Sequence, residues 1–375
     1  MVIEHEVETV LVDARRLEDF VIEVLGKLEV SAEHAREVAE VLLKADLTGV
    51  DSHGVPRLPN YVARLKSGAV RPKPQVRVVH ELASTALVDG DDGLGMIAGR
   101  RAMEIAITKA QATGAGFVTV RNSSHYGIAG FYARMALPHN MIGISMTNVG
   151  AGGGTPPTFG RTGLFGTNPI AVAAPTRNGP PFVMDFATTV VAFGKLQIAM
   201  RRGHEVPMGW VMDKDGVLTT NPNTRAEGGY LLPLGGLRET GGHKGYGLML
   251  LVDILCGALS GAAFGATFAK LANESTREAG SAANTGHFFG ALRIDGFRPM
   301  DEFLDAMDEM YQVIHSSEKL PGQDRIYVHG EIDWETEQHR RVHGIPLDIP
   351  TYEGLEAISA DVGVPLDIRK DSPGK

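Results

Sequence analysis

The segment DSHGVPR, residues 51–57, lies between two predicted helices, and the rest of the chain is organised around it. It places a hydroxyl, an imidazole and a guanidinium within six residues, on Ser52, His53 and Arg57. A glycine ends the helix before it, and a proline inside it precedes the next helix. Such side chains can bind a small anion and move a proton, so we interpret residues 51–57 as the active-site turn.

Amphipathic helices are predicted on both sides of this turn. Apolar residues at three- and four-residue spacing predict two helices before it, beginning after Asp13 and after the cap Ser31, and one helix from Arg57 to Leu65. The apolar faces of the first two comprise Leu17, Phe20, Val21, Val24, Leu25 and Leu28, and Ala35, Val38, Ala39, Leu42, Leu43 and Ala45. His53 is therefore expected at a junction between helix and turn, away from both apolar faces.

Beyond the turn, β-like and helical segments alternate, which is typical of an α/β protein. Residues 76–79 and 86–88 are predicted to form a hairpin, and residues 204–234, rich in Pro, Gly, Asn and Asp, a long ordered loop. The other predicted strands are residues 116–122, 141–149, 164–176, 180–189 and 286–297, and the other predicted helices follow GIAG and GGHKGYG or span residues 190–203, 301–314 and 352–362.

One glycine pattern resembles a dinucleotide-binding loop but has the wrong spacing. Gly93, Gly95 and Gly99 follow a short strand as G-x-G-x-x-x-G, which is one residue longer than the Rossmann fingerprint. No acidic residue follows the next strand at the expected place. We interpret these glycines as the start of a helix.

Composition limits the class of protein. The chain has 375 residues, 43% of them hydrophobic and 22% charged, which suits two or three globular domains. The net charge of -9 argues against nucleic acid and anionic membranes as partners. The single cysteine, Cys256, is expected to be buried and inert, and it suits a reducing compartment. MVIEHEVETV does not resemble a signal peptide, and the apolar stretch 246–272 is interrupted by Asp253, so we expect a buried helix there and a cytoplasmic protein.

Several side chains are candidates for acid–base chemistry and substrate binding. Asp185, at the end of a predicted strand, could orient His53 next to Ser52; the alternative is a capping Ser52 beside a surface histidine. Arg57 could hold a substrate carboxylate through two parallel hydrogen bonds, or it could be a solvated arginine at a helix start. Thr167 and Asn168, in GTNP, are candidates for contacts with substrate oxygens, although Asn168 could equally satisfy its own turn.

Other residues suggest a site for a phosphate-bearing molecule. His125 lies where a strand ends and a helix begins, so the amides of residues 127–129 could bind a phosphate; a purely structural histidine is the alternative. Lys244 lies among glycines before a helix, where it could bind a phosphate or ribose or simply be solvated. The sequence has no zinc-protease, serine-hydrolase or Walker motif and no cysteine pair, so we expect no catalytic metal.

Five segments in order resemble the malate/L-lactate dehydrogenase family, which is unrelated to the Rossmann-type enzymes of similar name. They are DSHGVPRLPNYVARLKSG, RNSSHYGIAGFYARMA, FGTNPIAVAAPT, VMDFATT and GGHKGYGLMLLVDILCGALSGA, and the likeness extends roughly from Leu17 to Gly322. The family includes malate, sulfolactate and ureidoglycolate dehydrogenases, diketogulonate reductase and piperideine-carboxylate reductase.

The resemblance implies a fold and a domain arrangement. It implies a non-Rossmann α/β fold in which residues 119–292 form a mixed-sheet domain that binds a nicotinamide cofactor, NAD or NADP. Residues 10–118 and 293–316 would form a discontinuous, largely helical substrate and dimerisation domain. Residues 317–375 would form an extension that packs with the N-terminus, and the chain is expected to be a homodimer.

The resemblance also implies roles for particular residues. Ser52, His53 and Asp185 match a catalytic relay with His53 as acid and base, although the histidine matching His125 has that role in some members. Arg57 matches the contact to a substrate carboxylate. The matching cofactor contacts are His125, Tyr126, Gly127, Ile128, Ala129, Lys244 and Lys319. Lys319 stands where arginine is common, which leaves the choice between NAD and NADP open.

These residues predict an oxidoreductase that interconverts a 2-hydroxy acid and a 2-oxo acid. Malate and oxaloacetate are the first candidates, and L-lactate and pyruvate the second. The alternatives are reduction of a cyclic imine acid, oxidation of ureidoglycolate or sulfolactate, and a nonenzymatic ligand-binding protein with the same fold.

Overall fold

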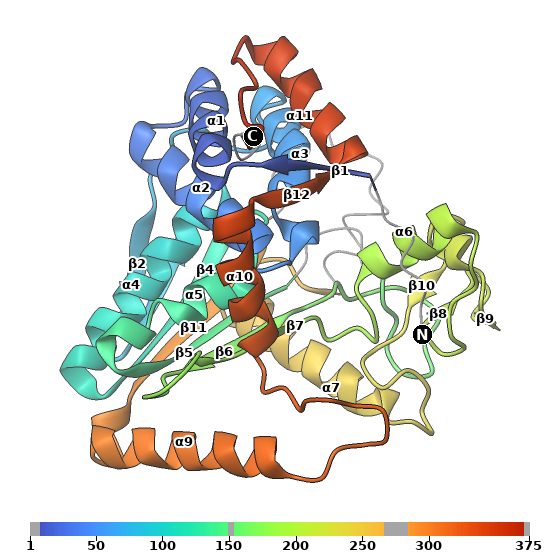
Figure 1. Cartoon of the computed structure of the whole chain (residues 1–375). Helices are drawn as coiled ribbons and strands as arrows, with labels where there is room; N and C mark the ends of the chain where they lie inside the picture. Colours follow the sequence, from blue (N-terminus) through green and yellow to red (C-terminus); the bar gives the residue numbers. More distant parts are fainter. Residues whose placement is uncertain (1–7, 149–153, 266–283, 371–375) are drawn as a thin grey trace, which may run out of the picture.

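A computed structural model of the chain describes residues 8–148, 154–265 and 284–370. Its centre is a seven-stranded mixed sheet in the order β2-β3-β4-β11-β5-β6-β7 (Figure 1). The pair β3 and β4 is parallel and the other neighbouring pairs are antiparallel, so the predicted mixed sheet and the predicted hairpin of β2 with β3 are both confirmed. The strands are β2 (Arg77–Glu81), β3 (Thr85–Asp89), β4 (Ala115–Ser123), β11 (Thr285–Arg293), β5 (Met141–Thr147), β6 (Ile170–Ala174) and β7 (Phe182–Phe186).

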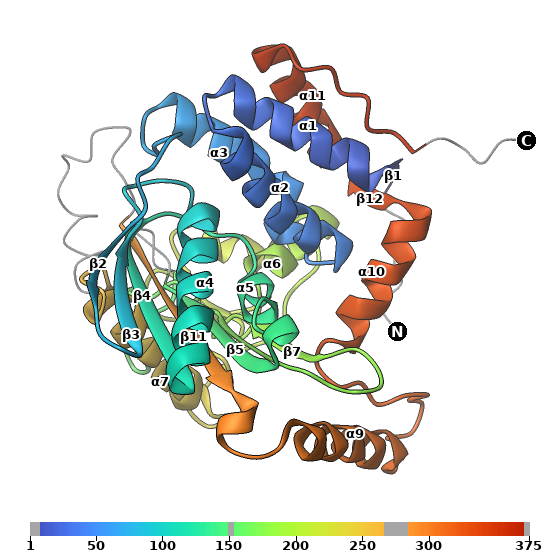
Figure 2. The same cartoon turned by 90° about the vertical axis from the view of Figure 1, so that its left-hand side faces the viewer.

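Helices cover both faces of this sheet (Figure 2). α4 (Gly95–Thr113) and α5 (Ala129–Arg134) lie on one face, and α7 (Gly242–Val252) with the π-helical segment η5 (Asp253–Ala258) lies on the other. The two faces alternate along β11, because Phe288 packs with buried Cys256 of η5 whereas Phe289 belongs to the core on the α4 side.

The glycines whose pattern resembles a dinucleotide-binding loop lie at the start of α4, as expected. The amide of Gly95 donates to Ser124 Oγ at 3.1 Å, and a Cβ on Gly95 would lie 2.2 Å from the Ser124 carbonyl oxygen. The glycine therefore serves a close approach between helix α4 and the chain that leaves β4.

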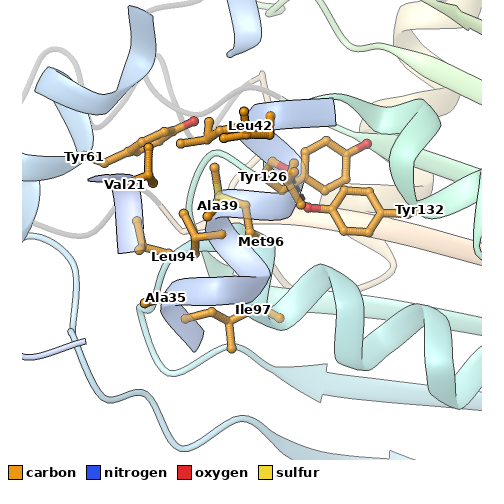
Figure 3. Close-up of a cluster of buried hydrophobic side chains, with 14 of the residues drawn as sticks. Val21, Ala35, Ala39, Leu42, Tyr61, Leu94, Met96, Ile97, Tyr126 and Tyr132 are labelled. Atoms are coloured by element: carbon orange, nitrogen blue, oxygen red, sulfur yellow. Dashed lines mark hydrogen bonds between the residues drawn. The ribbon is translucent and has the colours of Figure 1, made fainter. Parts of the chain in front are cut away.

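A layer of helices packs above α4 and buries the largest core of the molecule (Figure 1). Figure 3 shows Met96 and Ile97 of α4 in one buried cluster with Val21 of α1 and with Ala35, Ala39 and Leu42 of α2, positions that these helices were expected to bury. The layer comprises α1 (Ala14–Lys27), α2 (Ala32–Leu47), α3 (Leu58–Lys66) and α11 (Ile349–Val362). Asp13 and Ser31 cap α1 and α2 through their side chains.

The two ends of the described chain meet beside this layer. β1 (Thr9–Val12) pairs antiparallel with β12 (Ile345–Asp348), from Thr9 opposite Asp348 to Val12 opposite Ile345. The domain boundaries stay a prediction, since the single large sheet takes strands from both sides of residue 118.

Two expectations about the C-terminal half were wrong, and one helix was missed. Residues 204–234, expected as a loop, contain a small antiparallel sheet of β10 (Tyr230–Leu231), β8 (Val211–Met212) and β9 (Leu218–Thr219), beside η4 (Pro222–Arg225). Helix α10 (Glu331–His343) was not predicted. The outer face of α7 is not buried, since Leu250 and Leu251 are 40% and 42% exposed. Residues 266–272 of that apolar stretch lie outside the described residues.

Two further helices lie in the described part of the chain. α6 (Phe193–Arg202) precedes the small sheet, and α9 (Met300–Ser316) lies at the bottom of Figure 1, away from the helical layer. Short 3-10 turns occur at Leu137–His139 and Ile294–Gly296. Along the described residues, no helix has the length and apolar character needed to cross a membrane.

Candidate active site

The active-site turn consists of two short 3-10 turns, Asp51–His53 and Val55–Arg57, joined at Gly54 and followed directly by α3. Ser52 Oγ and His53 Nδ1 are hydrogen-bonded at 2.8 Å. Arg57 Nε donates to the carbonyl oxygen of Ser52 at 2.7 Å. The turn therefore fixes the guanidinium and the imidazole relative to one another.

Arg57 has no carboxylate partner among the described residues, and its side chain is exposed. Its Nε is used within the turn, so the two terminal nitrogens remain for a ligand. An arginine fork with two available nitrogens matches a carboxylate group. The alternative, that Arg57 is merely a solvated arginine at a helix start, is less favoured, because the hydrogen bond to the Ser52 carbonyl oxygen orients its side chain.

His125 lies against this turn. Its ring stacks on that of His53, with the centroids 5.5 Å apart and the planes 25° apart. Tyr61, a buried residue of α3, contacts His125 Nδ1 through its hydroxyl at 2.6 Å. Sequence patterns gave Tyr61 only a packing role on the apolar side of α3; its hydroxyl was the one sign of a polar contact.

The tautomer of His125 follows from its neighbours. The backbone N–H of Gly127 donates to Nδ1 at 3.3 Å, so this nitrogen is an acceptor. Burial raises the pKa of the Tyr61 phenol, which therefore keeps its proton and donates to the same nitrogen. A neutral His125 then carries its proton on Nε2 and is a hydrogen-bond donor there.

Both imidazoles are neutral near pH 7. Burial lowers the pKa of His53 to about 4, and the positive charge of Arg57 lowers it further in the same direction. Burial also lowers the pKa of His125 well below its ordinary value, and the charges of His53 and Arg57 contribute. An unpaired guanidinium beside two neutral rings gives the site a positive charge that an anionic substrate would compensate.

Asp185 does not complete the predicted relay in this structure. It lies in β7, and its carboxylate accepts a hydrogen bond from the Gly130 amide at 2.6 Å. No hydrogen bond or ion pair joins Asp185 to His53 among the described residues. The reason is the start of α5, whose unsatisfied N–H groups attract a carboxylate. Burial raises the pKa of Asp185 to about 6, the Asp333 carboxylate adds to this, and Gly130 and Arg134 oppose it.

The same contact bears on the prediction that the amides of residues 127–129 bind a phosphate. Asp185 already occupies the start of α5, which has only six residues. Tyr126 is buried, and its ring stacks on that of Tyr132 at 4.7 Å (Figure 3). The Tyr126 ring also stacks on that of His287 at 4.6 Å. Gly127 follows Tyr126, and the side chains of Ile128 and Ala129 after it are buried. Cofactor binding by this turn stays a prediction.

Asn168 has a structural contact instead of the expected substrate contact. Its side chain is fully buried and donates to the Met249 carbonyl oxygen at 3.0 Å and to Asp253 Oδ1 at 3.2 Å. A substrate cannot touch this amide in the present conformation. Thr167 is half-buried, and its carbonyl oxygen accepts from the Thr188 amide at 2.8 Å; its role with substrate stays a prediction.

The two candidate cofactor lysines are exposed. Lys244 lies in the first turn of α7, and Lys319 lies between α9 and α10. Neither ammonium group has a hydrogen bond or an ion pair with another described residue. Both are therefore available to a phosphate group. Within the described ranges, no cluster of three or more His, Cys, Asp or Glu side chains is arranged to hold a metal ion.

Comparison with known proteins identifies the class. The family described as malate/L-lactate dehydrogenase matches residues 12–356. The chain is 48% identical to the malate dehydrogenase of Pyrococcus horikoshii over 350 residues, which are 93% of this chain and 94% of that protein. It is 38% identical to the L-sulfolactate dehydrogenase of Methanocaldococcus jannaschii over 347 residues, 92% of this chain and 96% of that protein. A solved structure of malate dehydrogenase from Pyrococcus horikoshii OT3 has a TM-score of 0.86 at 44% identity, covering 97% of this chain and 99% of that one.

The fold and the site define an oxidoreductase that acts on 2-hydroxy acids. The chain belongs to the malate/L-lactate dehydrogenase family, and the predicted resemblance and non-Rossmann fold are confirmed. Membership in this family of dehydrogenases implies a nicotinamide cofactor.

Proposed function

We propose that this enzyme interconverts malate and oxaloacetate with NAD or NADP. The observation that carries this proposal is the uncompensated Arg57 guanidinium, held by the Ser52 carbonyl oxygen beside the stacked His53 and His125. The similarity to a protein named malate dehydrogenase supports malate as the first candidate. L-Lactate is the second candidate, and the relative named L-sulfolactate dehydrogenase supports sulfolactate as an alternative.

In this proposal Arg57 binds the substrate carboxylate through its two terminal nitrogens. His53, with Nδ1 bonded to Ser52, presents Nε2 to the reacting oxygen and accepts its proton when the hydroxy acid is oxidised. The bound carboxylate neutralises the charge of Arg57, which removes one cause of the lowered His53 pKa and makes the imidazole a better base. His125 donates from Nε2 to the substrate or the cofactor amide.

Asp185 has a supporting role in the proposal. By accepting from the Gly130 amide it fixes the first turn of α5, and thereby the chain that carries His125.

The donor set fits a dinucleotide. Lys244 and Lys319 offer exposed, unpaired cations for phosphate groups, and the neutral His125 offers a donor for an amide oxygen. When bound, the nicotinamide accepts or supplies the hydride. Because a lysine contacts a phosphate as a point charge, the preference between NAD and NADP is open to measurement.

A substrate panel tests this function. Oxaloacetate, pyruvate, 3-sulfopyruvate and a cyclic imine acid are each offered with NADH and with NADPH, and ureidoglycolate with the oxidised cofactors, while the absorbance of the reduced nicotinamide is followed. Turnover of oxaloacetate above the others supports the proposal, and absence of turnover with both oxaloacetate and pyruvate contradicts it.

The His53→Ala variant separates an enzyme from a nonenzymatic ligand-binding protein. The proposal predicts loss of turnover with cofactor affinity retained, measured by the fluorescence of bound NADH. A ligand-binding protein would show no turnover before or after the substitution.

We further propose that the enzyme is a cytoplasmic homodimer. Its apolar surface supports a second copy as partner, since α9 exposes Met310 and Val313 by 54% and 62% and α7 exposes Leu250 and Leu251. The only cysteine is buried and free, which suits a reducing compartment. Light scattering after size-exclusion chromatography measures the assembly directly.

A further inference from the structure

The active-site turn is held from outside by α10, a helix near the other end of the chain. Arg340 of α10 has a side chain that is only 13% exposed. Its Nη1 donates to the carbonyl oxygen of Asp46, in the last turn of α2, and to Asp51 Oδ1 at 2.5 Å. Its Nη2 lies 3.4 Å from Asp51 Oδ2. One guanidinium therefore bridges the end of α2 and the first residue of the turn.

The inner side of the turn is held by the side chain of Asp46. This carboxylate is fully buried, and its Oδ2 accepts from the Val55 amide at 2.9 Å. It lies so close to Gly54 that a Cβ there would be 1.8 Å from Asp46 Oδ1. The turn is thus fixed at Asp51, by Arg340, and at Val55, by Asp46, on either side of His53.

The outer contact depends on an arginine that bonds two groups at once. The planar fork of Arg340 reaches a carbonyl oxygen and a carboxylate together, which a single ammonium group does less well. The carboxylate of Asp51 is 53% exposed, so the ion pair alone is worth little, and the bond to the Asp46 carbonyl oxygen gives the contact its fixed direction.

We propose that Arg340 is a positioning residue for the reaction, which holds the turn so that Arg57 and His53 meet the substrate together. The inference rests on the proposed function. Arg340 itself lies behind the turn, and it acts through Asp51 and the Asp46 carbonyl oxygen. A displacement of about 1 Å in a site of this kind costs on the order of 100-fold in rate.

Kinetics of Arg340→Ala, Arg340→Lys and Arg341→Ala test this role. Arg341 is the matched control, because it is the next residue of α10 and pairs with Glu337 of the same helix, which also pairs with Lys44 of α2 and so keeps one cationic partner in Arg341→Ala. We expect Arg340→Ala to lower kcat/KM for the 2-oxo acid about 100-fold, with the KM for the nicotinamide cofactor unchanged within about twofold. Arg340→Lys should recover part of the loss, and Arg341→Ala should match the wild type.

Hydrogen exchange of the turn gives a readout that needs no substrate. In the wild type the Val55 amide is bonded to Asp46, so a peptide covering residues 48–58 should exchange slowly. The same peptide should exchange at least about tenfold faster in Arg340→Ala and at the wild-type rate in Arg341→Ala. If the wild type turns over no acid of the panel, the proposed function fails, while this comparison still decides whether Arg340 holds the turn.

Three results would overturn the inference. They are unchanged exchange in Arg340→Ala, wild-type kinetics in that variant, and an equal loss in Arg341→Ala. Should Arg340→Ala fail to fold, Arg340→Lys keeps the positive charge but offers a single ammonium group to the Asp46 carbonyl oxygen and the Asp51 carboxylate, and a loss of kcat/KM confined to the acid substrate supports the role. Wild-type kinetics of Arg340→Lys would then refute it.

Discussion

The imidazole ring of His125 stacks on that of His53, with the ring centroids 5.5 Å apart and the planes 25° apart. Two protonated rings at this distance would repel one another, and the nearby charge of Arg57 disfavours protonation of either. The stacked pair therefore accepts at most one proton at a time. In the proposed reaction the two rings act together, with His125 as the donor through Nε2 and His53 as the proton acceptor.

Arg57→Lys should separate substrate binding from the rest of the reaction. Lysine keeps the positive charge but cannot offer two parallel nitrogens, so we expect the KM for the 2-oxo acid to rise by roughly 10- to 100-fold. The affinity for NADH should stay within about twofold, because Arg57 bonds only to the Ser52 carbonyl oxygen among the described residues. Steady-state kinetics and fluorescence titration measure the two effects. A variant that loses cofactor and substrate affinity equally would contradict the carboxylate role.

Tyr61→Phe should weaken catalysis by releasing His125. The substitution keeps the buried ring but removes the donor 2.6 Å from Nδ1, leaving the longer bond from the Gly127 amide. We expect kcat to fall about tenfold and the free energy of unfolding to fall by about 1 kcal/mol. The shape of the pH–rate profile is the decisive measurement, since a ring free to change tautomer shifts its acidic limb. A profile and rate identical to the wild type would show that Tyr61 has only a packing role.

The buried His287 should make the protein less stable below pH 6.5. Its two ring nitrogens bond to Thr147 and Ser123, and burial lowers its pKa to about 3. The folded state therefore binds this proton less readily than the unfolded state, whose histidines titrate near 6.5. The contribution of the neutral His287 to the free energy of unfolding is present in full above pH 6.5 and is lost as the pH falls toward 3. For one such group the free energy of unfolding falls by about 2 kcal/mol between pH 6.5 and 5.

Urea unfolding at pH 7 and pH 5 measures this dependence. The His287→Gln variant, which cannot be protonated, should lose about 2 kcal/mol less than the wild type over the same interval. An equal loss in both proteins would mean that His287 is not the titrating group. Asp185 works in the opposite sense, because its raised pKa of about 6 lowers stability as the pH rises from 3.8 to 6.

Gly54→Ala should displace the active-site turn. A Cβ at this position would meet the buried Asp46 carboxylate at 1.8 Å, which neither group can avoid without moving. We expect a loss of about 1 to 3 kcal/mol in the free energy of unfolding and a larger loss of activity. Gly26→Ala is the matched control, since nothing lies within 4 Å of its Cβ in α1 and it should be neutral or slightly stabilising. Comparable activity in the two variants would contradict the account of the turn.

Much of this fold follows from local patterns in the chain. Apolar spacing identified α1, α2 and α3, because each of them buries a continuous hydrophobic face. The order of the polar motifs along the chain indicated the family, and the resemblance to the family predicted the mixed sheet. Helix α10 could not be found this way, since the residues it buries are Glu331 and Glu337 and its isoleucine is exposed. A helix held by ion pairs has no hydrophobic period to detect.

Parts of the candidate site were equally beyond local patterns. Ser52, His53 and Arg57 lie together because they are neighbours in sequence. Asp185 instead accepts a hydrogen bond from an amide at the start of α5. The N–H groups there have no partner within the helix, so they compete with His53 for this carboxylate. Asn168 is buried because its side chain donates a hydrogen bond to Asp253, which lies 85 residues farther along the chain. Sequence gives such residues the right chemistry but not the distances between them.

The pairing of β1 with β12 has a consequence for how the protein is made. Thr9–Val12 are synthesised long before their partner Ile345–Asp348, and Arg340 lies shortly before that partner in the chain. A nascent chain therefore carries an unpaired strand and a loosely held active-site turn until α10 and β12 have been synthesised. Nicotinamide turnover should begin only when these two elements have been released, so that a chain interrupted before α10 would fold in part and remain inactive.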